Sequence, residues 1–360
     1  EFIKKFKLYS GKNDLLVILI SDKYPIKTKN ERSIRYFQIK FLNKRLNWLI
    51  RLVWENTNLI YLIRNLKPDI FLTFSHSLPL FKLKVPTIVG LSNLAPFSNL
   101  AFKKDSLVGK IRLLLLKYII KHATTKATAV IALSNFGKKI LIKNDIIQDK
   151  IYKISIGVKK QKKKLINYKL IRSRKKYILY VSHFYRYKNF EQLILAYSKL
   201  PKLIKLNFRL KLVGNFSNEQ YVENLRKLSQ ELSIEHLIDF IPSLQGEALN
   251  KLYKNASLFV FPSRIENCPN ILLEAMSFSL PVLVVKTEPM PEFAGNAAKY
   301  FKLDDEFDLS KKINLILTSN SLLNKMSKMS YARSRQYSWN LFTKKLIDLS
   351  RQVYSKNKQK

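Results

Sequence analysis

The chain has 360 residues, 47% of them hydrophobic, which is enough for two packed domains. A single cysteine excludes an internal disulfide, and the four histidines lack metal-ligand spacing, so we expect no metal ion. The formal net charge of +41 favours a polyanion or anionic lipid as a partner, unless a compositional bias of the genome alone accounts for the lysines.

The first half of the chain alternates short apolar runs with helical patterns. Strands are expected at residues 15–21, 70–74, 87–89 and 129–133. Residues 34–66 carry apolar side chains at mostly three- and four-residue spacing, which predicts helix. Strands that alternate with helices predict an α/β fold with a parallel sheet.

Two of the predicted helical stretches are both basic and apolar. One, residues 32–54, contains Trp48 and Trp54, and the other, residues 107–121, contains two aliphatic runs. Such helices can lie in a membrane interface. A stripe that faces the core, with a solvated basic back, is the simpler explanation for most of their length.

The second half repeats the alternation after a basic segment. Residues 159–176 hold ten basic residues and no acid. Further strands are expected at residues 177–181, 209–213, 239–241, 256–261 and 281–285, and a last helix at residues 339–354.

The segment FPSRIENCPNILLEAMSFSLPVLVV, residues 261–285, contains Glu266 and Glu274 with seven residues between them. It continues an apolar strand and reads as a loop, a helix and a second strand. Ligands of such sheets lie at the carboxyl ends of the strands, which is where Glu266 is expected. Three backbone amides at the helix start would be free to bind an anion: those of Asn270, Ile271 and Leu272. A nucleotide-sugar needs both provisions, amides for its diphosphate and carboxylates for its hydroxyls.

This segment resembles the E-x7-E signature of the family 4 (group 1) retaining glycosyltransferases, which have the GT-B fold. Residues 178–200 are similar to the first strand and helix of that family's donor domain, and residues 290–301 and 337–349 to its closing segments. In the first half, residues 93–97 and 129–141 also have counterparts. The resemblance therefore covers nearly the whole chain.

The resemblance implies two Rossmann-like domains that face each other across a cleft. Residues 1–158 would form the acceptor-side domain, 159–176 a basic linker and 177–337 the donor domain, with 338–360 a helix that crosses back. The chain starts at Glu1 and opens on what resembles the end of the family's first helix. We therefore expect the N-terminal domain to lack its first strand.

By resemblance, Glu266 contacts the donor sugar and Glu274 the ribose of the nucleotide. Lys188, in YRYKNF, would lie against the diphosphate and stabilise the leaving nucleoside diphosphate. The arginine common in the family five residues earlier is His183 here, and Arg186 is expected to supply its charge. A solvated surface position is the simpler explanation for any one of these residues, and their place in the motifs favours function.

Two residues of the first half are acceptor-side candidates. His76 follows the strand at residues 70–74, and Asn93 lies in the sequence NLAPF. A lone histidine is more often structural. Glu292, in MPEF, follows the strand that ends at Val285 and is either a cleft residue or a helix N-terminal residue favoured by the helix dipole.

The implied activity is that of a retaining hexosyltransferase (EC 2.4 class). It would move a hexosyl unit from a UDP- or GDP-linked sugar to a glycan or lipid-linked acceptor, in bacterial surface polysaccharide or lipopolysaccharide synthesis. No metal and no cofactor are expected, because the nucleotide-sugar is a substrate. The alternatives are a GT-B sugar-nucleotide epimerase or hydrolase and, from the charge alone, a polyanion- or nucleic-acid-binding protein.

The expected location follows from the apolar runs. None of them reaches the roughly 20 residues that a membrane-spanning helix needs, and no signal peptide is visible. We expect a cytoplasmic protein with an anionic membrane surface as a peripheral partner, on the inner face of the cytoplasmic membrane. No specific nucleic acid is expected.

Overall fold

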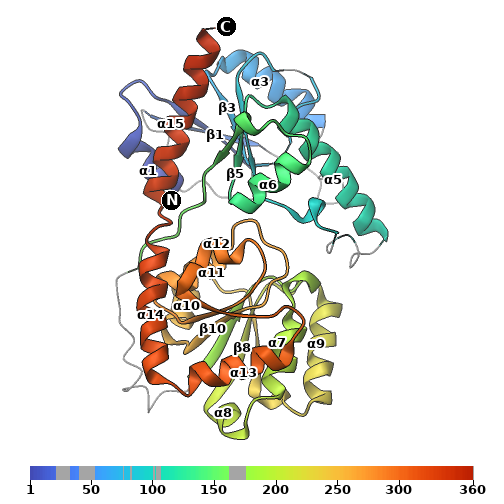
Figure 1. The fold of residues 1–360 in the computed structure, drawn as a ribbon. Helices are drawn as coiled ribbons and strands as arrows, with labels where there is room; N and C mark the ends of the chain where they lie inside the picture. The colour runs from blue at the N-terminus through green and yellow to red at the C-terminus, as the bar shows by residue number, and fades with distance from the viewer. Residues whose placement is uncertain are drawn as a thin grey trace.

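The structure, a computed structural model, describes residues 1–21, 33–39, 53–75, 77–81, 83–99, 102, 107–161 and 176–359. It forms two lobes stacked end to end, each built around parallel strands (Figure 1). We call these lobes the N-terminal half and the C-terminal half, and we count the final helix with the N-terminal half.

The C-terminal half contains a six-stranded parallel sheet with the order β12-β11-β10-β7-β8-β9. Its strands are β7 Lys176–Val181, β8 Phe208–Gly214, β9 Ile238–Pro242, β10 Leu258–Phe261, β11 Val282–Val285 and β12 Ala298–Phe301. The interior strands β10 and β11 are buried at every position, as expected when helices cover both faces of a parallel sheet. In register, Leu258 of β10 pairs with Ile178 of β7, so the loops that follow these two strands are neighbours.

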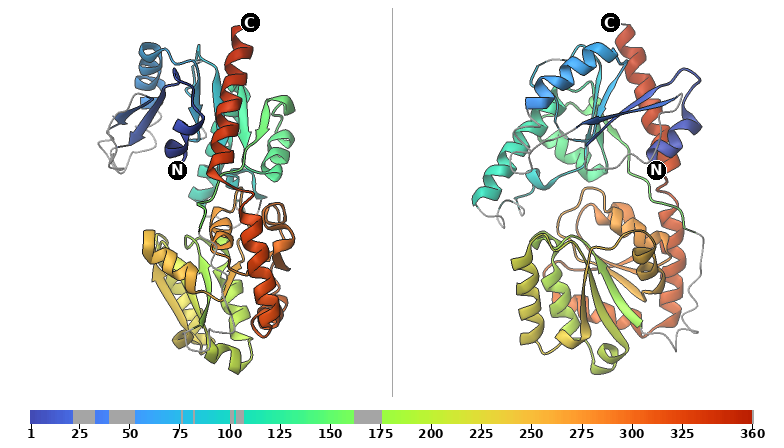
Figure 2. Two further views of the ribbon diagram at one scale, coloured as in Figure 1. Left: turned by 90° about the vertical axis from the view of Figure 1, so that its left-hand side faces the viewer. Right: turned by 180° about the vertical axis from the view of Figure 1, so that it is seen from behind.

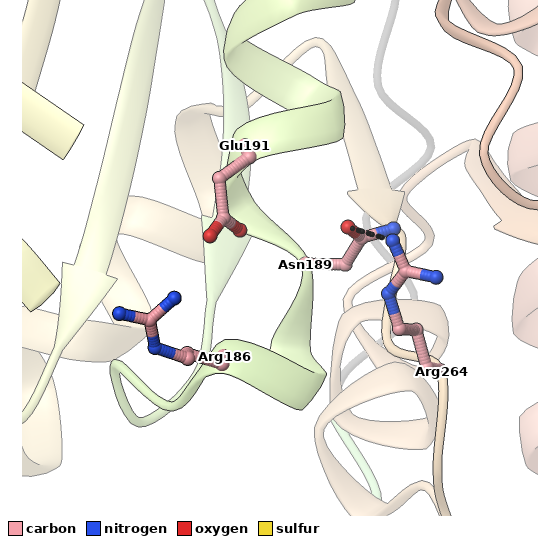
Figure 3. A pocket seen from close by; sticks show the side chains of 4 residues that line it. All are labelled: Arg186, Asn189, Glu191 and Arg264. Atoms are coloured by element: carbon pink, nitrogen blue, oxygen red, sulfur yellow. Dashed lines mark hydrogen bonds between the residues drawn. The ribbon is translucent and has the colours of Figure 1, made fainter. Parts of the chain in front are cut away.

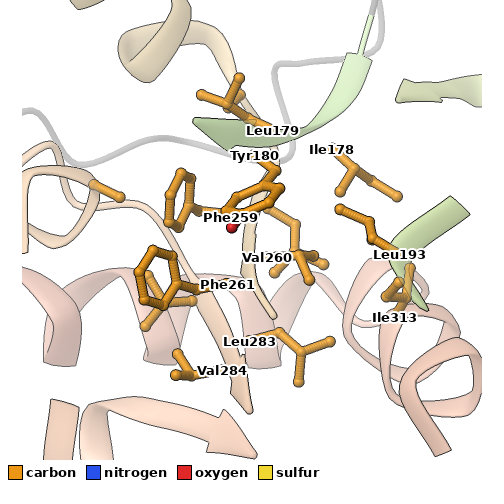
Figure 4. Close-up of a cluster of buried hydrophobic side chains, with 14 of the residues drawn as sticks. Ile178, Leu179, Tyr180, Leu193, Phe259, Val260, Phe261, Leu283, Val284 and Ile313 are labelled. Atoms are coloured by element: carbon orange, nitrogen blue, oxygen red, sulfur yellow. The ribbon is translucent and has the colours of Figure 1, made fainter. Parts of the chain in front are cut away.

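Helices connect these strands and cover the sheet. They are α7 Phe190–Ser198, α8 Lys202–Asn207, α9 Glu219–Glu231, α10 Gly246–Asn255, α11 Asn270–Ser277, α12 Met290–Ala294, α13 Glu306–Leu317 and α14 Asn320–Ser334. The core between them is rich in aromatic residues, with Tyr180, Phe259 and Phe261 in contact at its centre (Figure 4). These side chains fix the two strands that carry the loops of the candidate site.

The N-terminal half contains a four-stranded parallel sheet with the order β3-β4-β5-β6 and a separate parallel pair, β1-β2. The strands are β1 Leu16–Ser21, β2 Ile34–Ile39, β3 Phe71–Thr73, β4 Thr87–Leu91, β5 Ala129–Ala132 and β6 Ile151–Lys153. The helices are α1 Phe2–Tyr9, α3 Asn58–Leu66, α5 Leu107–Lys126 and α6 Asn135–Lys143.

The last helix, α15 Trp339–Lys358, leaves the C-terminal half and runs along the N-terminal half (Figure 2). Its buried face, which includes Phe342, Leu346 and Val353, packs against the N-terminal sheet. Where the chain passes between the halves, a Cβ at Gly157 would overlap the backbone of Ser338 and Trp339. Only glycine allows this close approach of the two crossing segments.

The predicted α/β class with parallel strands is confirmed, and every predicted strand is present. The helix predicted over residues 34–66 is wrong at its start, because Ile34–Ile39 is strand β2, in register with β1. Residues 40–52 lie outside the described residues, so the first basic helical stretch is not seen. The domain boundaries stay a prediction, and residues 162–175 of the basic linker also lie outside the described part of the chain.

Candidate functional site

The candidate site centres on an ion pair between Lys188 and Glu266. Lys188 lies in the loop after β7 and Glu266 in the loop after β10, 78 residues further along the chain. The ammonium Nζ donates to Oε1 of Glu266 at 2.6 Å, and the two side chains are only 11% and 13% exposed. The sheet register places the loops together, because β7 and β10 are adjacent parallel strands.

The backbone around Lys188 is held in place by several hydrogen bonds. The short 3-10 helix Arg186–Lys188 closes when the Lys188 amide donates to the carbonyl of Tyr185 at 2.8 Å. The buried hydroxyl of Tyr180, in the strand below, donates to the carbonyl of Lys188 at 2.8 Å. The second loop is tied to the first, since the Arg264 amide donates to the carbonyl of Tyr187 at 2.9 Å.

The pair leaves donor capacity on Lys188. An ammonium has three N–H donors, and Glu266 accepts from one of them. The ring of Tyr187 lies beneath the same ammonium, with its centroid 4.9 Å from Nζ. Lys188 is therefore a pre-positioned, nearly buried cation, held between a carboxylate and an aromatic face, that can bind an anion with its remaining donors.

Glu274 lies in the second turn of α11, on the helix that the Glu266 loop feeds. Burial raises the pKa of its carboxyl above the ordinary value. Oε2 of Glu274 lies 3.5 Å from the hydroxyl of Tyr253, a fully buried residue of α10. Within the described residues no cation forms an ion pair with Glu274, so this partly buried carboxylate has only a long hydrogen bond to stabilise its charge.

The start of α11 offers fewer amides than predicted. Its first residue is Asn270, with Pro269 as a cap that makes no side-chain hydrogen bond. The Asn270 amide already donates to the carbonyl of Cys268 at 2.8 Å. The amides of Ile271 and Leu272 remain in the first turn, where a helix has no internal acceptors for them.

A pocket of about 400 Å³ opens beside the Lys188 loop (Figure 3). Its lining residues are Arg186, Asn189, Glu191 and Arg264. Arg264 donates to Asn189 Oδ1 at 2.9 Å and pairs with Asp304, so its charge is already matched. Arg186 is exposed and lies over the ring of Tyr221, with 5.8 Å between the guanidinium carbon and the ring centroid.

The other predicted residues do not belong to the group of side chains around Lys188 and Glu266. His183 is exposed and contacts the ring of Tyr185, with centroids 6.0 Å apart. Asn93 is exposed and its Oδ1 accepts from the amide of Ala95 at 2.9 Å, which caps a short 3-10 turn. His76 lies outside the described residues. The acceptor-side candidates therefore stay predictions.

Two residues form contacts between the two halves of the molecule. The sequence did not identify the first, Asn267, and did not explain the second, Glu292. Asn267, next to Glu266, donates through Nδ2 to the carbonyl of Leu91 at 2.7 Å and accepts from Ser134 Oγ at 3.2 Å. It is 5% exposed. A buried amide next to a motif glutamate is the signal that could have identified it.

Glu292 lies in the first turn of its own helix, α12, and its side chain reaches the N-terminal half. Its carboxylate accepts from the amide of Asn135 at 2.8 Å and pairs with Lys153 at 2.9 Å, so it caps α6 in the N-terminal half. The position predicted at a helix N-terminus is confirmed for α12, and the carboxylate also serves the start of α6. The sequence could not show this, because the two residues are separated by 157 positions.

Neither metal nor thiol chemistry is suggested by the described residues. No group of three or more His, Cys, Asp or Glu side chains in them could hold a metal ion. Burial raises the pKa of the Cys268 thiol to about 12, so this cysteine is held protonated and unreactive. No helix among the described residues is long and apolar enough to cross a bilayer.

Comparison with known families and curated proteins agrees with this geometry. Residues 161–333 match the family model described as glycosyl transferases group 1. An uncharacterised glycosyltransferase of Haemophilus influenzae is 29% identical over 172 residues, which is 47% of this chain and 47% of the relative. The O-antigen chain mannosyltransferase B of Escherichia coli is 30% identical over 172 residues, 48% of this chain and 45% of the relative. The chain thus matches about half the length of these relatives.

Solved structures extend the similarity to the whole fold. The sucrose-phosphate synthase of Thermosynechococcus elongatus superposes with a TM-score of 0.74 at 15% identity, covering 94% of this chain and 89% of that one. HepE of Anabaena, solved with UDP and glucose, superposes with a TM-score of 0.67 at 16% identity, covering 88% and 86%. The fold is therefore GT-B, and residues 161–333 are similar to the group 1 glycosyl transferases.

Proposed function

We propose that this protein is a retaining hexosyltransferase that uses a UDP- or GDP-linked sugar as its donor. The acceptor is a glycan or a lipid-linked sugar of a bacterial surface polysaccharide or lipopolysaccharide. The observation that carries the proposal is the nearly buried Lys188–Glu266 pair at the carboxyl ends of two adjacent strands, next to the helix that carries Glu274.

The diphosphate of the donor is assigned to Lys188 and the first turn of α11. The ammonium has two N–H donors beyond the one given to Glu266. The amides of Ile271 and Leu272 and the positive end of the α11 dipole add to the attraction for phosphate. Arg186, an exposed residue of the same loop that lines the neighbouring pocket, is a further cation for the diphosphate.

The two motif carboxylates are assigned to hydroxyl groups. Glu274, partly buried and without a cation partner among the described residues, is suited to accept hydrogen bonds from the ribose diol. Glu266, already oriented by Lys188, is suited to accept from hydroxyls of the sugar. A carboxylate with oriented oxygens specifies such a ligand through charge-assisted hydrogen bonds.

The transfer step needs no protein nucleophile. The acceptor hydroxyl attacks the anomeric carbon on the face that the nucleoside diphosphate leaves, and a departing phosphate oxygen takes its proton. Lys188 stabilises the charge that grows on the diphosphate as the glycosidic bond breaks. Asn267 and Glu292 hold the two halves in contact beside this region, and we expect this contact to limit access of water to the reacting groups.

A titration of donors tests the proposal. UDP-, GDP- and ADP-sugars are titrated calorimetrically into the wild type and into Lys188→Gln. Saturable binding of one class by the wild type, weakened in the variant, supports the assignment, and equal binding by both proteins refutes it. Product that forms only when an acceptor glycan is added separates a transferase from an epimerase or hydrolase.

A further inference from the structure

The helix α5 exposes a row of large apolar side chains to solvent. Five residues form this row, which we call the α5 face: Leu107, Ile111, Leu114, Leu115 and Tyr118. Their exposed fractions are 75%, 53%, 55%, 53% and 69%. The spacing of four, three, one and three residues places all five on one side of an α-helix. The core-facing role predicted for most of this stretch is therefore wrong for these residues.

The opposite side of α5 is packed, so the exposure does not arise from a loose helix. Leu113, Ile120 and Ala123 are at most 4% exposed. Leu113 and Leu114 are neighbours in sequence, about 100° apart around the helix axis, and one is buried while the other is more than half exposed. The helix thus has two apolar faces, of which the domain core covers one.

Basic residues border the α5 face, and the helix contains no acid. Lys110 and Lys117 follow one edge, and Arg112 lies on the other side, whereas Lys121, further along the first edge, is already paired with Asp145 at 2.8 Å. The ammonium of Lys110 lies 6.0 Å from the ring centroid of Phe102, which is itself 37% exposed. An apolar strip with a cationic border is complementary to a surface that is apolar inside and negatively charged outside.

We propose that the α5 face docks this protein on an anionic lipid bilayer. The helix lies in the plane of the interface, with the leucines and Tyr118 among the upper acyl chains and the lysines at the phosphate level. It does not cross the bilayer, because five basic residues are spread along its 20 positions. The helix lies on the side of the N-terminal half away from α15, where neither α15 nor the C-terminal sheet covers it (Figures 1 and 2).

The inference extends the proposed function without depending on it. A protein held at the bilayer by α5 meets acceptors that are anchored in lipid, which favours the lipid-linked alternative among the acceptors. The docking face and the donor loops belong to different halves of the chain. Donor binding in solution is therefore expected to survive loss of the face, so a failure of either idea can be told from a failure of the other.

Vesicle flotation tests the proposal. Vesicles of phosphatidylcholine alone, or mixed with phosphatidylglycerol, are floated with the wild type and with the double variant Leu114→Gln/Leu115→Gln. The matched control is Leu203→Gln/Leu206→Gln, on α8 of the C-terminal half, because these leucines are 69% and 67% exposed and also stand beside lysines. Raised salt screens the attraction due to overall charge and isolates the apolar contribution.

We expect the wild type to float with the anionic vesicles and the α5 variant to bind them about tenfold or more weakly, since insertion energy follows the apolar area buried. The α8 variant is expected to bind as the wild type does. An equal loss of vesicle binding in the α5 and α8 variants, or no loss in either variant, overturns the proposal. So does a change of oligomeric state without a change in vesicle binding, which would make the face a self-association surface.

A urea-unfolding transition like that of the wild type shows that a variant is folded. If the leucine pair does not fold, Ile111→Gln/Tyr118→Gln removes two other residues of the same face, with the same expected loss and the same refuting outcomes.

Discussion

The substitution Glu274→Gln separates a ligand-binding role for this residue from a structural one. Burial raises the pKa of Glu274, so the folded protein disfavours its charged form. Its long contact to Tyr253, 3.5 Å, can be kept by a glutamine oxygen. The change therefore removes a partly buried charge at almost no steric cost, and the free energy of unfolding at neutral pH is expected to rise.

Donor affinity should fall in the Glu274→Gln variant, although the free energy of unfolding rises. A carboxylate that accepts from two hydroxyls makes two charge-assisted hydrogen bonds, and glutamine offers one neutral acceptor and one amide in their place. The difference is about 2–3 kcal/mol, which is about 30- to 150-fold in Kd. A residue that stabilised only the fold would not show this opposition.

The pH dependence has a defined sign. Because the folded pKa of Glu274 is raised, the folded protein loses stability as pH rises through that pKa, and it gains donor affinity over the same range. Binding of a nucleotide-sugar should therefore weaken as pH falls through the raised pKa of Glu274, which is a higher pH than an ordinary glutamate would cause. The donor is the right probe, because its esterified diphosphate has no group that titrates there.

The assay is calorimetric titration with the donor alongside urea unfolding, each on the wild type, Glu274→Gln and the control Glu231→Gln. Glu231 is exposed at the end of α9 and receives the same chemical change. A Glu274→Gln protein that binds donor as the wild type does, with no altered pH profile, refutes the ribose assignment.

The remaining predictions concern other parts of the chain. Lys188→Gln should lower kcat of transfer by about 100-fold in a steady-state assay, and an unchanged kcat would remove Lys188 from the chemistry. Glu292→Gln should lower the free energy of unfolding, measured in urea, by about 1–2 kcal/mol. The control Glu288→Gln, at an exposed position, should leave it unchanged. An equal change in the free energy of unfolding of both variants would contradict the contact between Glu292 and α6. Phe259→Ala should cost about 3–5 kcal/mol on the same measurement, because this side chain is fully buried, and a loss below about 1 kcal/mol would contradict its packing. Iodoacetamide should leave Cys268 unmodified in the native protein and alkylate it in urea, and native labelling would contradict its raised pKa of about 12.

The sequence predicted those features that repeat along the chain or occur within one short segment. The alternation of apolar runs with helical spacing identified the parallel strands, and the E-x7-E segment predicts Glu266 and Glu274 as the carboxylates of the candidate site. Apolar spacing failed at residues 34–39, where a six-residue strand pairs in register with β1. Pairing with another segment overrode the local pattern there.

The contacts between distant segments could not be predicted. The partner of Lys188 is 78 residues away and that of Glu292 is 157 residues away, and no local pattern encodes either distance. The same limit explains α5. Its apolar residues surround the helix, and only the packed structure shows that Leu113 is buried while Leu114 is exposed.

Hydrogen–deuterium exchange with and without a saturating nucleotide-sugar tests the central claim most directly. The account predicts that donor slows exchange at two segments, residues 182–189 and 264–275, which hold Lys188, Glu266 and the start of α11. It predicts no such slowing on α5 or α8. Protection confined to the N-terminal half, or the absence of any protection at these two loops, would contradict the claim that the donor binds at the carboxyl ends of β7 and β10.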